Sequence, residues 1–250
     1  VRLECTDLPV LWQTSVAGLL NDGLDQAVIR LCPQLGGGMR EHEATLTARI
    51  EETGEETTRT VSVPAEGALA VLEIPVEKPL LWWPHGHGSQ SLYTVRLDLA
   101  VSGNPVQSRV FRTGVRRVEL DQQSHPVEGR YFHLKVNGRR IFCKGANWVP
   151  PDLFYSAVPA ERERRLVHIA RELNFNFLRV WGCGSWASHA MCEACDRAGI
   201  MVWHDFLFAC GDYAGDREDF EEDVVREARW GVRELSPHPS LVVWCGNNEV

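Results

Sequence analysis

Leu241–Glu249, with the sequence LVVWCGNNE, begins as an apolar run of strand length and ends in two amides beside a carboxyl. A run that is apolar on both faces is typical of a strand buried in a parallel sheet. In a βα barrel, catalytic groups lie at the C-terminal ends of such strands. We therefore expect Glu249 to act as a proton donor in catalysis.

Upstream of this stretch the sequence alternates between strand-like and helix-like segments. Apolar runs predict further strands over Ile141–Trp148, Phe175–Trp181 and Ile200–Phe206. Apolar residues at helical spacing predict three intervening helices, of which the first runs from Pro159 to about Leu173. The second helix is capped by Gly199 and lined by Ala187, Ala190, Met191 and Ala194. The third helix is lined by Phe220, Val224, Ala228 and Val232. Strands alternating with helices indicate a parallel α/β unit.

Polar or aromatic residues follow all four predicted strands, which is the layout of a barrel mouth: Asn147 and Trp148, Arg179 and Trp181, His204 and Asp205, Asn248 and Glu249. An open doubly wound sheet is the alternative, but no G-x-G-x-x-G follows any strand, so nothing supports a dinucleotide site. A full (β/α)8 TIM barrel takes roughly 250 residues, and only about 110 are present after residue 140. We expect a partial barrel from a longer protein, since Val1 is also not an initiator Met.

The first part of the chain alternates with a period of two. Leu46, Ala48 and Ile50 alternate with polar neighbours, and Gly- and Pro-containing turns punctuate the pattern. This predicts antiparallel sheets in a β-sandwich over 1–118, followed by the barrel portion over 119–250. Trp82 and Trp83 are expected in the sandwich core.

Composition narrows the classes of partner. The net charge of −8 argues against nucleic acid and provides no basic membrane patch. No apolar run approaches the roughly 18–20 residues that cross a bilayer. Several of the eight cysteines lie in apolar strand-like runs, where a free thiol acts as a small hydrophobe, and this favours a reducing compartment such as the cytoplasm. Cys192 and Cys195 have no second C-x-x-C pair and are expected to be buried free thiols rather than zinc ligands. His85-Gly86-His87 has no partner cluster, so no metal site is predicted. Nothing in the composition indicates an oligomeric state.

The chain resembles glycoside hydrolase family 2, which holds β-galactosidases, β-glucuronidases and β-mannosidases. Four motifs carry the resemblance: Leu81-Trp82-Trp83-Pro84 with Leu92-Tyr93, Phe111-Arg112-Thr113-Gly114-Val115-Arg116, Val136-Asn137-Gly138 through Phe142-Cys143-Lys144-Gly145-Ala146-Asn147-Trp148, and Asn247-Asn248-Glu249. Arg179-Val180-Trp181-Gly182-Cys183-Gly184 is similar to the β-mannosidase branch, as is Val202–Phe206 with Cys210 after it. That branch usually has Gly where Cys183 stands.

The resemblance implies that the β-sandwich is an immunoglobulin-like domain. It also implies a retaining exo-β-mannosidase that releases terminal β-D-mannose from oligosaccharides or glycoconjugates without a cofactor. Glu249 would be the acid/base, and the nucleophile would lie beyond this chain. Retaining enzymes hold the two carboxyls about 5–5.5 Å apart. The implied substrate-binding residues are Asn248 at the sugar 2-hydroxyl, Trp181 against the ring, Arg179 and Asp205 near the site carboxylates, and Trp148.

Structural roles remain open for several of these residues. Trp148 and Trp181 also fit core aromatics, Asp205 a helix cap, and Arg179 a structural ion-pair partner. Two other functions also remain open. One is a sister activity, namely β-galactosidase, β-glucuronidase or exo-β-glucosaminidase. The other is a non-catalytic glycan-binding protein on the same fold.

Overall fold

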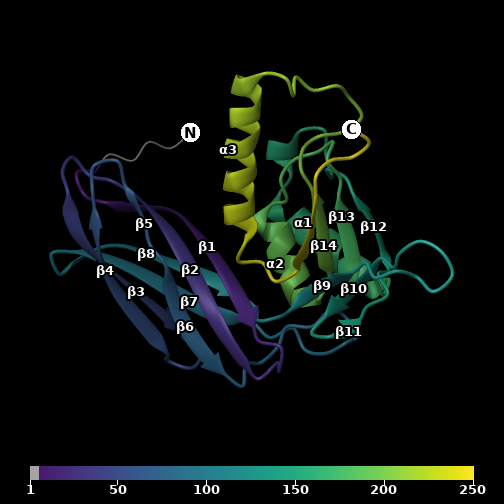
Figure 1. Cartoon of the computed structure of the whole chain (residues 1–250), viewed down its shortest axis with the longest axis horizontal. Coiled ribbons are helices and arrows are strands. Elements are labelled where there is room, and N and C mark those ends of the chain that lie inside the picture. The colour runs from purple at the N-terminus through teal and green to yellow at the C-terminus, as the bar shows by residue number, and fades with distance from the viewer. Residues whose placement is uncertain (1–5) are drawn as a thin grey trace. The chain divides into compact units, whose positions relative to one another are not determined.

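The computed structural model describes residues 6–250, so Cys5 lies outside it (Figure 1). The chain divides into two compact units. The first comprises Val1–Leu80 and Leu92–Val115, and the second comprises Leu81–Ser91 and Arg116–Val250.

The first unit is a sandwich of two antiparallel sheets. One sheet contains β1 (Val10–Leu20), β2 (Gln26–Gly36), β5 (Ala68–Leu69) and β6 (Leu72–Glu77), and the other contains β3 (His42–Ile50), β4 (Glu56–Val63), β7 (Tyr93–Val101) and β8 (Asn104–Thr113). Every second residue of β3 from Ala44 onward is buried, as a sheet with one core face requires. Ile29, Leu31 and Ile74 are buried on the facing sheet. The sandwich that the alternation predicts is therefore present.

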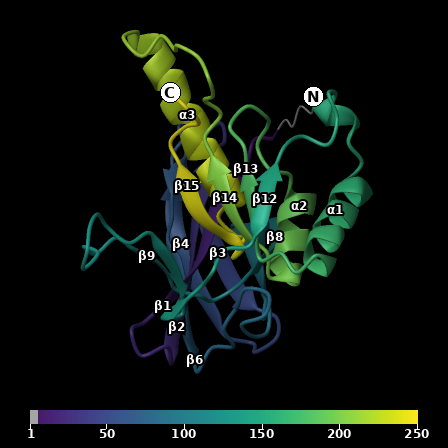
Figure 2. The same ribbon diagram turned by 90° about the vertical axis from the view of Figure 1, so that its right-hand side faces the viewer.

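From Arg116 onward, the second unit first forms a small antiparallel sheet of β9 (Val118–Asp121), β10 (His133–Val136) and β11 (Arg139–Arg140). A parallel sheet then follows in the order β12 (Gly145–Trp148), β13 (Phe177–Val180), β14 (Met201–Asp205), β15 (Leu241–Cys245) (Figure 2). The connections contain η1 (Tyr155–Ala157), α1 (Ala160–Glu172), α2 (His189–Ala198) and α3 (Glu218–Leu235). These are the alternating strands and helices that the sequence predicts.

The three helices cover one face of the parallel sheet. Leu178, Val180 and Val202 point into a buried core that residues of all three helices complete, including Val167, Met191 and Leu235. Because successive strand residues point to opposite faces, Arg179, Trp203 and Asp205 belong to the other face. That alternation separates the apolar core from the polar strand ends.

Both ends of α2 are capped by the residues next to the helix. The Ser188 hydroxyl accepts a hydrogen bond from the Met191 N–H at 3.0 Å, and Gly199 adopts a left-handed φ of 72°. The prediction of Gly199 as the cap is confirmed. Cys192 and Cys195 are buried free thiols as predicted, and burial raises their pKa values well above the usual range.

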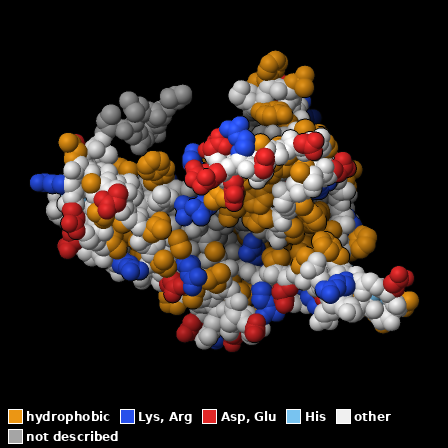
Figure 3. Space-filling model, turned by 45° about the horizontal axis from the view of Figure 1, so that its top comes forward, with side chains coloured by type: hydrophobic (Ala, Val, Ile, Leu, Met, Phe, Trp, Pro, Cys, Tyr) orange, Lys and Arg blue, Asp and Glu red, His pale blue; other side chains and the backbone are white. Residues whose placement is uncertain are grey.

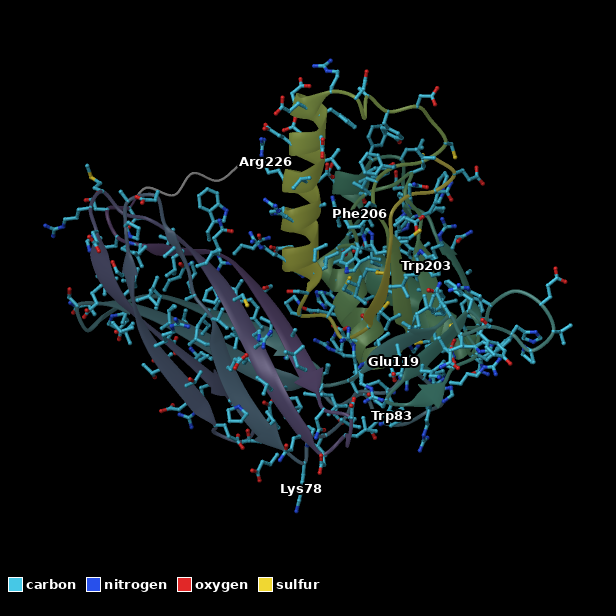
Figure 4. All side chains as sticks on the ribbon, viewed as in Figure 1. Lys78, Trp83, Glu119, Trp203, Phe206 and Arg226 are labelled. Carbon is cyan, nitrogen blue, oxygen red and sulfur yellow. The ribbon has the colours of Figure 1, made fainter. Side chains whose placement is uncertain are left out.

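The prediction that Trp82 and Trp83 belong to the sandwich core is wrong, because Leu81–Ser91 is part of the second unit. Trp82 is fully buried, and its indole N–H donates to the Asp196 carbonyl at 2.8 Å. A buried indole needs an acceptor, and the last turn of a helix offers unpaired carbonyls. The Arg139 guanidinium lies 4.7 Å from the centre of the Trp83 ring, which Figure 4 labels.

Arg116, which lies just before β9, holds the start of β15 within the second unit. Its guanidinium donates to the Pro239 carbonyl at 3.0 Å and to the Leu241 carbonyl at 2.8 Å. Burial lowers the pKa of Arg116 to about 10, so the side chain stays charged at neutral pH. Within residues 6–250 no helix has the length and apolar character that a bilayer crossing demands.

Candidate active site

An ion pair joins the ends of β13 and β14. The Arg179 guanidinium donates from Nη2 to Asp205 Oδ2 at 2.6 Å and from Nε to Oδ1 at 3.2 Å. The two residues face each other because β13 and β14 run parallel with their C-terminal ends at one edge. The fork of arginine matches a carboxylate through two bonds, which fixes both groups in one orientation.

Asp205 is fully buried, and neighbouring N–H groups complete its set of partners. The Trp203 indole donates to Oδ1 at 2.8 Å, and the Gly182 amide donates to Oδ2 at 3.2 Å. A Cβ on Gly182 would lie 2.7 Å from the Phe206 carbonyl, so glycine permits this approach of the loop. With both oxygens occupied, the Asp205 carboxylate is placed to orient Arg179. The helix-cap reading of Asp205 does not apply.

Arg179 reaches a third strand end through Asn248. Its Nη2 also donates to Asn248 Oδ1 at 2.8 Å. The backbone of Asn248 pairs with the loop after β14 through an Asn248 N–H bond to the Phe208 carbonyl at 2.9 Å. Three of the residues predicted from sequence therefore lie in one hydrogen-bonded group.

Glu249 follows directly in a left-handed conformation with φ of 60°. Its side chain is exposed, and Oε2 lies 3.6 Å from the Cys210 sulfur. A non-glycine residue at this φ is uncommon, and such residues cluster at active sites and ligand-binding segments. The carboxyl is thus presented at the strand ends beside Asn248.

The two predicted tryptophans lie at the ends of β12 and β13, Trp148 as the last residue of β12 and Trp181 directly after β13. Trp148 packs against the helix-side core, on the face opposite Arg179. The Trp181 amide donates to the Trp148 carbonyl at 3.2 Å, and both residues line a small cavity of about 40 Å³ with Pro150. Asn147 pairs with Arg179 in the strand register, and alternation places it on the Arg179 face.

Two residues of the site were not assigned roles from sequence. Trp203, labelled in Figure 4, holds Asp205, and Cys210 bridges Asn248 and Glu249. Alternation along β14 would have placed Trp203 on the face of Asp205. No sequence periodicity indicates the position of Cys210, because it lies in the irregular loop between β14 and α3.

His204, the neighbour of Asp205 on β14, lies on the face of the sheet that the helices cover. Its ring Nε2 accepts from the Ala187 amide at 3.0 Å, so Nδ1 carries the proton and donates to the Asp205 carbonyl at 2.6 Å. Burial lowers the pKa of His204 below its usual 6.5, even though the Asp205 carbonyl and carboxylate act in the opposite direction. The neutral ring fills both hydrogen-bonding roles.

This pKa shift predicts a stability loss in acid. The unfolded chain binds a proton on His204 below pH 6.5, whereas the folded chain resists it, so the free energy of unfolding falls as pH drops below that value. One proton sets a limit of about 1.4 kcal/mol per pH unit. Urea unfolding of the wild type and His204→Gln from pH 7.5 to pH 5 should show a shallower pH slope for the variant. Equal slopes would contradict the prediction.

The described residues contain no group of three or more His, Cys, Asp or Glu side chains arranged to hold a metal ion. On the face seen in Figure 3, hydrophobic side chains gather over the second unit.

The polar side chains at the strand ends are suited to acid/base chemistry, since the exposed Glu249 carboxyl stands beside the Asn248 amide, whose orientation is fixed.

The model of the glycosyl hydrolases family 2 matches residues 34–116. β-Mannosidase B of Aspergillus clavatus is 38% identical over 205 residues, which are 82% of this chain and 24% of that protein. The β-mannosidase of Capra hircus is 40% identical over 184 residues, 71% of this chain and 21% of that protein. The chain belongs to glycosyl hydrolase family 2.

Solved structures of similar proteins agree with this fold. A β-D-mannosidase from Dictyoglomus thermophilum superposes with a TM-score of 0.88 at 35% identity, over 96% of this chain and 30% of that one. The exo-chitosanase of Amycolatopsis orientalis, at 20% identity and a TM-score of 0.79, shares the fold. The chain spans about a quarter of the length of the curated relatives it matches.

Proposed function

We propose that this chain is part of a retaining exo-β-mannosidase that removes terminal β-D-mannose from oligosaccharides or glycoconjugates. In this proposal residues 1–118 are its immunoglobulin-like domain, although Leu81–Ser91 and residues 116–118 cluster with the second unit, and residues 119–250 are the first half of a TIM barrel. The observation that carries the proposal is the hydrogen-bonded group at the ends of parallel strands, in which Arg179 bonds Asn248 and Cys210 links Asn248 to Glu249. The names of the relatives supply the substrate class.

In this mechanism Glu249 gives its proton to the glycosidic oxygen while a second carboxylate attacks the anomeric carbon. The aglycone leaves as an alcohol, and a covalent mannosyl-enzyme forms. Glu249, now ionised, takes a proton from water, whose oxygen attacks the same carbon and releases mannose. The second carboxylate is supplied by a later part of the longer protein.

The remaining residues orient substrate and acid. Asn248 binds the sugar 2-hydroxyl, a contact that strengthens as positive charge develops on the ring. Arg179, held by Asp205, fixes the Asn248 amide so that its NH₂ group is turned away from the arginine. Trp181 stacks against the sugar, and Trp148 supports the loop that carries Trp181.

Two activity measurements test the proposal. The longer protein that carries this chain is expected to hydrolyse p-nitrophenyl β-mannoside faster than the β-galactoside, β-glucuronide or β-glucosaminide. The 250-residue chain alone is expected to hydrolyse none of them, because it lacks the nucleophile. Turnover by the isolated chain would refute the proposal that only one of the two catalytic carboxyls lies in this chain. Preference of the longer protein for another glycoside would refute the substrate class.

A further inference from the structure

Two loops at the strand ends are joined around a cysteine. The Cys210 amide donates to the Asn248 carbonyl at 3.0 Å, which pairs the loop after β14 with the chain that leaves β15. Cys210 itself has a left-handed φ of 53°, close to the 60° of Glu249. Cys210 and Glu249 thus both adopt a backbone conformation that is uncommon for non-glycine residues, at the hydrogen bond that joins the two loops.

The Cys210 sulfur accepts one hydrogen bond and donates another. Asn248 Nδ2 donates to Sγ at 3.4 Å, and the thiol donates to Glu249 Oε2 at 3.6 Å. The Asn248 amide cannot be reversed without losing the Arg179 bond at Oδ1. Every donor from Arg179 to Glu249 therefore points in the same direction, and such chains strengthen through mutual polarisation.

The thiol is in the protonated state that this geometry needs. Partial desolvation raises the pKa of Cys210, and the hydrogen bond to Glu249 and the charge of that carboxyl raise it further. At neutral pH the sulfur therefore keeps the hydrogen that it donates.

We propose that Cys210 is a positioning residue for the acid/base, an inference that rests on the proposed function. The Glu249 side chain is exposed, so its rotamers are open unless a partner selects one. Cys210 selects the rotamer that keeps the carboxyl beside Asn248, where the glycosidic oxygen is protonated. Removing one weak hydrogen bond of this kind is expected to lower the rate of proton-assisted cleavage about three- to tenfold.

The test uses three variants of the longer protein and two substrates. Mannobiose needs a proton on its leaving oxygen, whereas dinitrophenyl β-mannoside departs without one. Cys210→Ala is expected to lower kcat/KM about three- to tenfold on mannobiose and less than about twofold on the dinitrophenyl substrate. Cys210→Ser restores a donor and is expected to recover most of the loss. Cys32→Ala, a partly buried free thiol on β2 of the first unit, is the control and should behave as the wild type.

The outcomes separate this inference from the proposed function. An equal loss of kcat/KM on both substrates in Cys210→Ala would mean that Cys210 only supports the loop. An unchanged kcat/KM on mannobiose would mean that Cys210 does not act on Glu249. Either result overturns the positioning role. If Glu249→Gln abolishes mannobiose cleavage in the same assay, the proposed function stands in both cases. If the longer protein has no β-mannosidase activity, both inferences fall.

Discussion

In the longer protein, Glu249→Gln is expected to lower kcat/KM on mannobiose by about 10²–10⁴. The amide has nearly the same shape but cannot give a proton to the glycosidic oxygen. Dinitrophenyl β-mannoside should retain most of its kcat/KM, because its leaving group needs no proton. Steady-state kinetics on both substrates measure the difference.

The control for this prediction is Glu222→Gln, which removes an exposed carboxyl from α3 in the same unit and should leave both rates unchanged. The melting temperature of Glu249→Gln should also match the wild type, since the side chain is exposed. Undiminished cleavage of mannobiose would remove Glu249 from the mechanism.

Asp205→Ala is expected to have the largest effect on stability. It leaves the Arg179 guanidinium without its counter-ion and the Trp203 indole and Gly182 amide without their acceptor. Breaking a buried pair by removing one partner costs about 3–5 kcal/mol. Urea unfolding followed by tryptophan fluorescence measures the loss in the free energy of unfolding.

Two variants calibrate this result. Asp205→Asn keeps one carbonyl oxygen and should lie between the wild type and Asp205→Ala. Asp223→Ala breaks an exposed ion pair with Arg226 on α3, where both side chains are more than two-thirds exposed, and should change stability little. Equal effects of Asp205→Ala and Asp223→Ala would show that the Arg179 pair is not needed to hold the strand ends.

Strand positions in the second unit follow from the sequence where an apolar run is bounded by polar residues. The apolar run that begins the stretch Leu241–Glu249 is the strand β15, Leu241–Cys245. The strand predicted over Ile141–Trp148 begins only at Gly145, because its partner β13 begins at Phe177. Before that point the Asn176 side chain takes the bonds of the ladder, accepting from the Lys144 amide at 2.7 Å and donating to the Phe142 carbonyl at 3.0 Å.

The candidate site was partly predictable for a related reason. Parallel strands end at one edge, so Arg179, Asp205 and Asn248 were expected near each other and are hydrogen-bonded. The position of Cys210 depends on the geometry of an irregular loop. The position of Trp82 depends on which unit its segment joins. Neither property produces a periodic pattern in the sequence. The barrel itself and the role of Glu249 stay predictions.

His204 and Asp205 are consecutive, yet one is tied to the helix layer and the other to Arg179 on the opposite face. A slip of one residue in the pairing of β14 would exchange them, placing a charged carboxylate among Trp186 and Trp244 and an uncharged ring against a guanidinium. A chain with β14 misaligned by one residue would therefore lose favourable contacts on both faces of the sheet. The same two residues that build the site thus also favour the native register of the strand that carries them.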